Sequence, residues 1–140
     1  MHTPPLILIA DDDQAFREIV SVKLRAAGYW VAEAMSGDEA FERAKTLKPD
    51  LIVVDMHMPS GNGAEALLDI KSDPELGKTP VFILSSEKDP WPTIKTENPS
   101  VAKELGADDY LYKEDDLDKN VGKIAAAIKR ISDGGQGGQQ

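Results

Sequence analysis

Hydrophobic and polar residues follow one another along the chain in short blocks. Three blocks, residues 6–10, 51–55 and 80–84, are almost wholly apolar, which is typical of strands buried on both faces of a sheet. Residues 29–34 and 109–112 carry aromatic and aliphatic side chains and are also predicted to be strands. The pattern therefore predicts five strands.

The segments between these blocks carry apolar residues at helical spacing. After the aspartates at 11–13, an apolar face runs as far as Gly28, where glycine can end a helix. Ser36 and Glu39 have the spacing of a capping box at the start of the next helix. Further helices are predicted over residues 37–47, 64–71, 99–105 and 117–131, and residues 87–98 are predicted to form a long loop.

Strands that alternate with helices in this way form a parallel sheet that is covered by helices on both faces. The predicted fold class is therefore α/β, with a five-stranded parallel sheet. A chain of 140 residues suits a single domain, which we place at residues 1–132. Residues 133–140 are mostly glycine and glutamine and are predicted to be a disordered tail.

The composition narrows the classes of function. The formal net charge is −9, and an acidic surface repels phosphate backbones and anionic lipid, so neither nucleic acid nor a membrane is expected as a partner. The chain has no cysteine, which excludes disulfides and thiolate metal sites. The apolar runs are too short for a membrane span and no signal peptide is recognisable, so we expect a cytoplasmic protein.

Polar side chains stand at the ends of four predicted strands. The first strand is followed by the aspartates at 11–13, and the third ends in Asp55. The fourth ends at Ser85, and Lys113 follows the fifth. Because the carboxyl ends of parallel strands meet at one edge, where ligands of such sheets bind, we expect these side chains to converge.

Clustered carboxylates repel one another, and a hard cation such as Mg²⁺ relieves the repulsion through oxygen ligands. Asp12 and Asp55 are the expected direct ligands, with Asp11 bound directly or through water, whereas Asp13 is expected to cap a helix. A carboxylate can also attack phosphorus. In that chemistry Lys113 neutralises the transferring group and Ser85 donates a hydrogen bond to it.

The order and spacing of six motifs resemble the receiver domain of two-component response regulators, over about residues 5–132. Each motif alone is weak, but together they are specific. They are ILIADD at 7–12, GDEA at 37–40, DLIVVDMHMP at 50–59, GNG at 61–63, PVFILSS at 80–86 and GADDYLYK at 106–113.

The resemblance implies a flavodoxin-like (βα)5 fold and a phosphorylation-activated switch that depends on Mg²⁺. The donor would be a sensor histidine kinase or a histidine phosphotransfer protein. The output would be a downstream protein target bound to the face of the fourth helix, fifth strand and last helix, or a homodimer. The implied site comprises the phosphoacceptor Asp55, the metal ligands Asp11, Asp12, Asp55 and the backbone carbonyl of His57, the phosphate-binding Lys113, and the switch residues Ser85 and Tyr110.

The chain departs from the family pattern at two places. The family has a proline with a cis peptide bond after the lysine, whereas Glu114 follows Lys113 here. A cis bond without proline costs about 3 kcal/mol, so either strain is stored or the loop is rebuilt. The loop at 87–98 is longer than is usual in the family and contains Trp91, and we expect it to be a partner-specific surface.

Two other functions remain open. Asp11 and Asp13 form a D-x-D motif, as in Mg²⁺-dependent phosphohydrolases that use an aspartyl-phosphate intermediate, but the chain has no cap domain to enclose a substrate. A degenerate receiver would bind its partners without phosphorylation, and the replacement of the proline by Glu114 leaves that alternative open. The complete acid set favours a phosphoacceptor, not an enzyme, whose only chemistry is self-catalysed phosphotransfer and autodephosphorylation.

Overall fold

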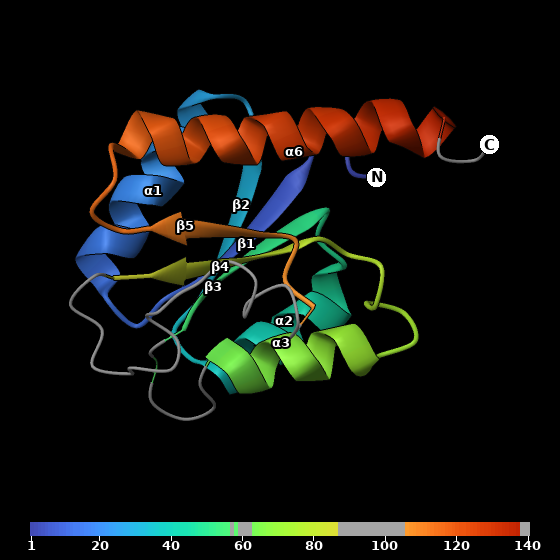
Figure 1. The fold of residues 1–140 in the computed structure, drawn as a ribbon, viewed down its shortest axis with the longest axis horizontal. Coiled ribbons are helices and arrows are strands. Elements are labelled where there is room, and N and C mark those ends of the chain that lie inside the picture. The colour runs from blue at the N-terminus through green and yellow to red at the C-terminus, as the bar shows by residue number, and fades with distance from the viewer. Residues whose placement is uncertain (57, 59–62, 87–105, 138–140) are drawn as a thin grey trace.

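The computed structural model describes residues 1–56, 58, 63–86 and 106–137 (Figure 1). Its strands form one parallel sheet in the order β2-β1-β3-β4-β5, which confirms the predicted five-stranded flavodoxin-like arrangement. The strands are β1 (Leu6–Ala10), β2 (Trp30–Ala34), β3 (Leu51–Asp55), β4 (Val81–Ser85) and β5 (Asp109–Tyr112).

Helices cover both faces of the sheet. In Figure 1, α1 and α6 lie on one face, and α2 and α3 lie on the other. The described helices are α1 (Gln14–Ala26), α2 (Gly37–Leu47), α3 (Gly63–Ser72) and α6 (Leu117–Gly137). Every neighbouring pair of strands is parallel, so all five carboxyl ends lie on the same edge of the sheet.

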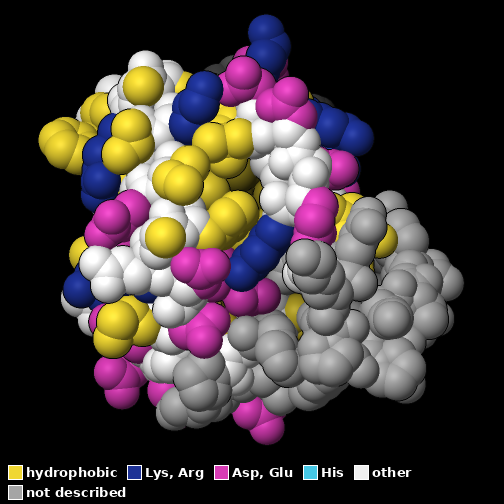
Figure 2. Space-filling model, turned by 90° about the vertical axis from the view of Figure 1, so that its left-hand side faces the viewer, with side chains coloured by type: hydrophobic (Ala, Val, Ile, Leu, Met, Phe, Trp, Pro, Cys, Tyr) yellow, Lys and Arg dark blue, Asp and Glu magenta, His cyan; other side chains and the backbone are white. Residues whose placement is uncertain are grey.

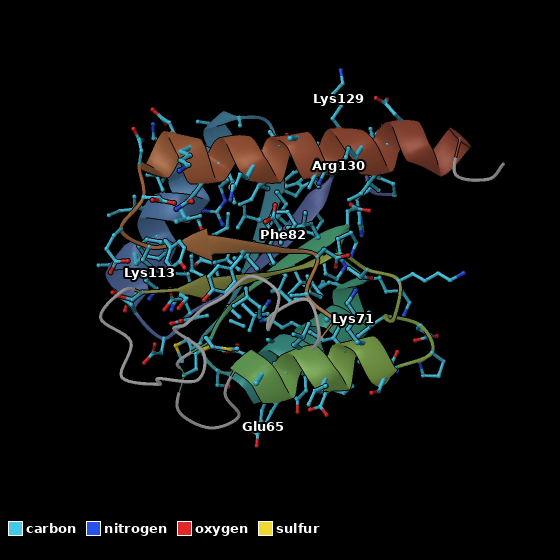
Figure 3. All side chains as sticks on the ribbon, viewed as in Figure 1. Glu65, Lys71, Phe82, Lys113, Lys129 and Arg130 are labelled. Atoms are coloured by element: carbon cyan, nitrogen blue, oxygen red, sulfur yellow. The ribbon has the colours of Figure 1, made fainter. Side chains whose placement is uncertain are left out.

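The core is divided between the two faces because successive side chains of a strand point in opposite directions. In β1, Ile7 and Ile9 pack in the cluster shared with α1 and α6, whereas Leu8 and Ala10 pack in the cluster shared with α2 and α3. Phe82 of β4 belongs to the first cluster and lies between the sheet and α6 (Figure 3). Burial of each large side chain contributes about 1.5–3 kcal/mol, so the continuous apolar runs hold the strands in this layer.

Local signals start and end the helices as the sequence predicts. The Asp13 carboxylate accepts a hydrogen bond from Phe16 N at 3.2 Å, which caps α1. The Ser36 hydroxyl accepts one from Glu39 N at 3.1 Å, and the Glu39 carboxylate accepts from Met35 N at 2.7 Å. Gly28, with a φ of +101°, turns the chain after α1 towards β2.

The structure differs from the prediction at the end of the chain. The last helix continues to Gly137, whereas the apolar pattern ends it at Ile131 and the composition predicts disorder from residue 133. Glycine has a poor helix propensity, so the composition of this segment predicts no helix. A helix that is already long can nevertheless extend, because each further residue adds a backbone hydrogen bond without a new nucleation step. Residues 138–140, the predicted loop at 87–98 and the predicted helix at 99–105 lie outside the described residues.

Gly63 is required where α3 packs on the end of β3. A Cβ atom at this position would lie 2.3 Å from the Asp55 carbonyl oxygen and 2.6 Å from Met56 Cα. Both are backbone atoms that cannot move aside, so we expect Gly63→Ala to lower the free energy of unfolding by about 1–3 kcal/mol or more. Urea denaturation measures this change.

Gly122 provides the matched control, because it lies in α6 and a Cβ atom there would meet nothing within 4 Å. Gly122→Ala should raise the free energy of unfolding by roughly 0.5–1 kcal/mol through helix propensity. Equal effects of the two substitutions would contradict the close approach at Gly63.

Candidate functional site

Four side chains at the carboxyl edge of the sheet come from four different strands. Asp11 directly follows β1, and Asp55 is the last residue of the neighbouring strand β3. Ser85 ends β4, and Lys113 follows β5. Figure 3 shows Lys113 at the edge where β4 and β5 end, beside the start of α1.

Three carboxylates form the centre of this site. Asp11, Asp12 and Asp55 each offer a carboxylate oxygen, and these oxygens lie within 4.8 Å of one another. Asp11 is 0% exposed and Asp55 is 3% exposed, whereas Asp12 faces solvent. Figure 2 views this edge, and acidic side chains gather around a basic one near its centre.

Lys113 compensates the charge of the two buried acids. Its Nζ lies 2.9 Å from Asp11 Oδ2 and 3.2 Å from Asp55 Oδ2, and it also lies 5.0 Å from the centre of the Phe16 ring. Burial, the largest single influence, would lower the pKa of the Lys113 ammonium. The hydrogen bond to Asp11 and the charges of Asp55 and Asp11 outweigh it, so that pKa lies above its ordinary value. Lys113 is therefore a fixed positive charge at neutral pH.

Ser85 and Tyr110 stand on neighbouring strands. The Ser85 hydroxyl is buried and has no hydrogen-bond partner among the described residues, so it is available to an oxygen that arrives beside it. The Tyr110 side chain is buried in the cluster shared with α2 and α3, and its ring packs edge-on against that of Tyr112 with 5.1 Å between centroids. His57 lies outside the described residues.

Comparison with known proteins identifies this arrangement. The sequence matches the response regulator receiver domain over residues 7–125. The chain belongs to this family. The chemotaxis protein CheY4 of Vibrio cholerae has a similar structure, with a TM-score of 0.75 at 27% identity over 87% of this chain and 97% of that one. The receiver domain of Francisella response regulator 1452 gives 0.78 at 31% identity, over 91% and 98% of the two chains.

Two proteins that are similar to this chain in sequence are longer than it. The DNA-binding dual master transcriptional regulator RpaA of Synechocystis is 32% identical over 90% of this chain. The KDP operon transcriptional regulatory protein KdpE of Escherichia coli is likewise 32% identical over 90%. The chain spans 50% and 52% of their lengths, so it corresponds to about half of each. The predicted absence of a nucleic-acid partner therefore stays a prediction.

The acidic cluster of this receiver domain fits Mg²⁺. All three side chains are oxygen donors, which suits a hard cation and disfavours softer metals. Asp11, Asp12 and Asp55 are the residues that would hold it. One lysine against three carboxylates leaves the described part of the site with net negative charge, which favours a divalent cation.

Arg17 also belongs to the site, although the sequence analysis did not single it out. Its guanidinium donates to the backbone carbonyl of Asp11 at 2.7 Å and to Glu33 Oε1 at 2.8 Å. The side chain is nearly buried beneath the turn that carries the acids. The available signal was its spacing, because Arg17 occupies the same helical face as the buried Val20 and Leu24.

The loop after Lys113 is rebuilt and does not keep the cis bond that is usual in the family. The only cis peptide bond among the described residues joins Thr3 and Pro4, so the bond between Lys113 and Glu114 is trans. A turn follows, in which Tyr112 O accepts from Asp115 N at 3.1 Å and from Asn120 Nδ2 at 2.8 Å. This turn leads the chain into α6.

None of the described helices is both long and apolar enough to cross a membrane.

The charge of Lys113 should oppose a cation at the acidic cluster. We expect Lys113→Met to strengthen Mg²⁺ binding by roughly three- to tenfold, because the ammonium no longer competes for Asp11 and Asp55. Titration calorimetry measures the dissociation constant. Since the pKa of Lys113 is raised, the lysine stays charged and the difference should persist from about pH 6 to about pH 9.

Lys119→Met is the control, because Lys119 is exposed on α6 and pairs only loosely with Asp115, at 3.7 Å. Its affinity for Mg²⁺ should equal that of the wild type. If Lys113→Met bound Mg²⁺ no more tightly than Lys119→Met, competition between lysine and cation would be refuted.

Proposed function

We propose that the chain is a phosphorylation-activated signalling switch, in which Asp55 accepts a phosphoryl group in a Mg²⁺-dependent reaction. The observation that carries this proposal is the position of the Asp55 carboxylate. It lies within 4.8 Å of two other carboxylates and 3.2 Å from a lysine ammonium, at the edge where ligands of parallel sheets bind. This combination of a nucleophile, a cation site and a fixed positive charge suits phosphoryl transfer.

In the transfer, a carboxylate oxygen of Asp55 attacks phosphorus and the bond from phosphorus to the donor breaks. The electron pair of that bond leaves with the donor, as acetate from acetyl phosphate or as imidazole from phosphohistidine. Bound Mg²⁺ would supply neutralisation of the phosphoryl oxygens. Lys113 holds a second positive charge beside them, and the unpartnered Ser85 hydroxyl donates a hydrogen bond to one of them.

Phosphorylation would be transmitted to a partner through a change in side-chain packing. A phosphoryl group brings nearly two negative charges, which draw Ser85 and Lys113 inwards. Tyr110 then fills the space near Ser85. This movement shifts the equilibrium between two conformations of the face that includes β5 and α6. A downstream protein, or a second copy of the chain in a homodimer, would recognise this face, in the cytoplasm and without contact to nucleic acid or membrane.

The phosphoryl donor would be a sensor histidine kinase or a histidine phosphotransfer protein that docks on the groove between α1 and α6. The groove is apolar, and Ile19 and Val22 are 53% and 62% exposed there. It borders the site, because α1 begins directly after the acids and Leu117, which also lines it, follows shortly after Lys113. In Figure 2 hydrophobic side chains surround a hollow beside the acidic group.

The two alternative functions predict other outcomes. A degenerate receiver would not be phosphorylated at all. A phosphohydrolase would carry the phosphoryl group on Asp11, but both oxygens of the Asp11 carboxylate already have partners, Asp13 N at Oδ1 and the Lys113 ammonium at Oδ2. These contacts hold Asp11 in place, which supports a metal-binding role, and the position of Asp55 supports the role of acceptor.

Intact-mass measurement tests the proposal. After incubation with acetyl phosphate and Mg²⁺, the wild type should gain the mass of one phosphoryl group, and omission of Mg²⁺ should suppress the gain. Asp55→Asn should abolish it, because an amide oxygen is a poor nucleophile towards phosphorus. Asp69→Asn, on the exposed side of α3, is the control and should be labelled like the wild type.

A wild type that gains no mass would favour the degenerate receiver. A gain that survives in Asp55→Asn and is lost in Asp11→Asn would favour the phosphohydrolase.

Val22→Glu tests the docking groove. It should slow labelling by a phosphorylated histidine kinase at least about tenfold, because a charge would be buried in the interface. Labelling by acetyl phosphate should not change, since this donor needs no docking surface. Leu68→Glu, an exposed apolar residue on α3, is the matched control and should leave both rates unchanged. A normal rate for Val22→Glu with the kinase that labels the wild type would refute docking here.

A further inference from the structure

A side-chain contact joins the two loops that follow β4 and β5. The Ser86 hydroxyl donates a hydrogen bond to Oε2 of Glu114, although the two residues are 28 positions apart in the sequence. Ser86 directly follows Ser85, and Glu114 directly follows Lys113. The contact therefore connects the immediate neighbours of the two residues proposed to bind the phosphoryl oxygens.

A backbone hydrogen bond lies beside this contact. Lys113 N donates to Ser85 O at 2.8 Å, at the end of the β4–β5 ladder. This bond lies at the end of the ladder, so it does not by itself restrain the residues that follow Ser85 and Lys113. The side-chain hydrogen bond joins the next residue after each of them, Ser86 and Glu114, and so restrains the two loops against each other. We call the pair of links the Ser86–Glu114 clamp.

We infer that Glu114 is a positioning residue for phosphoryl transfer, which acts through Ser86 to fix the distance between the Ser85 hydroxyl and the Lys113 ammonium. This inference rests on the proposed function of Asp55. A hydrogen bond has a preferred distance and angle, so the bond between Ser86 and Glu114 can hold the loop after β4 in a fixed position against the loop after β5. Transfer rates depend steeply on such distances, because the reacting groups must be held within a fraction of an ångström.

Glu114 stands where the family pattern has a proline, and the clamp gives this departure a function. A proline ring would restrict the backbone after Lys113 through covalent geometry. Here the Lys113–Glu114 bond is trans and a turn follows it, so the backbone lacks that restriction. The Glu114 side chain restores a connection to β4 through Ser86.

The test is the initial rate of labelling by acetyl phosphate at saturating Mg²⁺, measured by intact mass. Ser86→Ala and Glu114→Ala should each lower the rate by about three- to tenfold, and the double variant should lose no more than either single variant. Glu114→Gln and Ser86→Thr keep an acceptor and a donor, so they should restore most of the lost rate. Asp115→Ala removes a neighbouring carboxylate outside the clamp and should match the wild type.

Melting temperature and Mg²⁺ affinity are measured in parallel, because a local positioning role should leave both unchanged. Each other outcome overturns the clamp. A loss in Ser86→Ala without one in Glu114→Ala would mean that Ser86 acts directly. A loss of labelling rate in Glu114→Gln as large as that in Glu114→Ala would mean that the negative charge of Glu114, and not its hydrogen bond to Ser86, sets the rate. A parallel loss of stability would mean a role in folding. A wild type that is not labelled would overturn the proposed function and the clamp together.

Discussion

The site depends on two buried carboxylates that share one ammonium. Asp11 and Asp55 are almost wholly withdrawn from water, and each buried charge costs several kcal/mol unless it is paired. Lys113 contacts both, and the exposed Asp12 adds a third negative charge within 4.8 Å. One ammonium cannot balance three carboxylates. Among the residues that the structure describes, the site therefore holds an excess of negative charge, which a divalent cation can neutralise.

The fold keeps these charges together by restraining their backbones. Asp11 N donates to Ala34 O at 3.0 Å, and its carbonyl accepts from the buried Arg17 guanidinium at 2.7 Å, so the residue is held on both sides. Asp55 ends a fully buried strand, and α3 packs so closely on it that only glycine fits at position 63. The parallel sheet brings the strand ends to one edge, and these contacts fix the orientation of the acids there.

The sequence predicts local structure and, through the parallel order of the strands, the meeting of Asp11, Asp55 and Lys113 at one edge, but it misses individual side-chain contacts between distant residues. The strands follow from continuous apolar runs, and Asp13 and Ser36 act as caps because their partners lie three residues away. The contact of Arg17 with Glu33 spans 16 positions and that of Ser86 with Glu114 spans 28, so no local pattern indicates them. The extension of α6 to Gly137 was missed because glycine content describes propensity, whereas a long helix can extend cooperatively.

The clamp and the proposed switch operate on the same energy scale. A proline ring constrains its loop in every state of the protein, because the constraint is covalent. A hydroxyl–carboxylate hydrogen bond at a partly exposed position contributes only about 1 kcal/mol, and two states of a receiver that differ by a few kcal/mol can make or break it. If the chain is the proposed switch, the spacing of Ser85 and Lys113 becomes part of the equilibrium between its two states, because Glu114 stands in place of proline. The proposed function and the clamp together then imply that a change at Ser86 or Glu114 alters both the rate of phosphoryl transfer and the balance between the states.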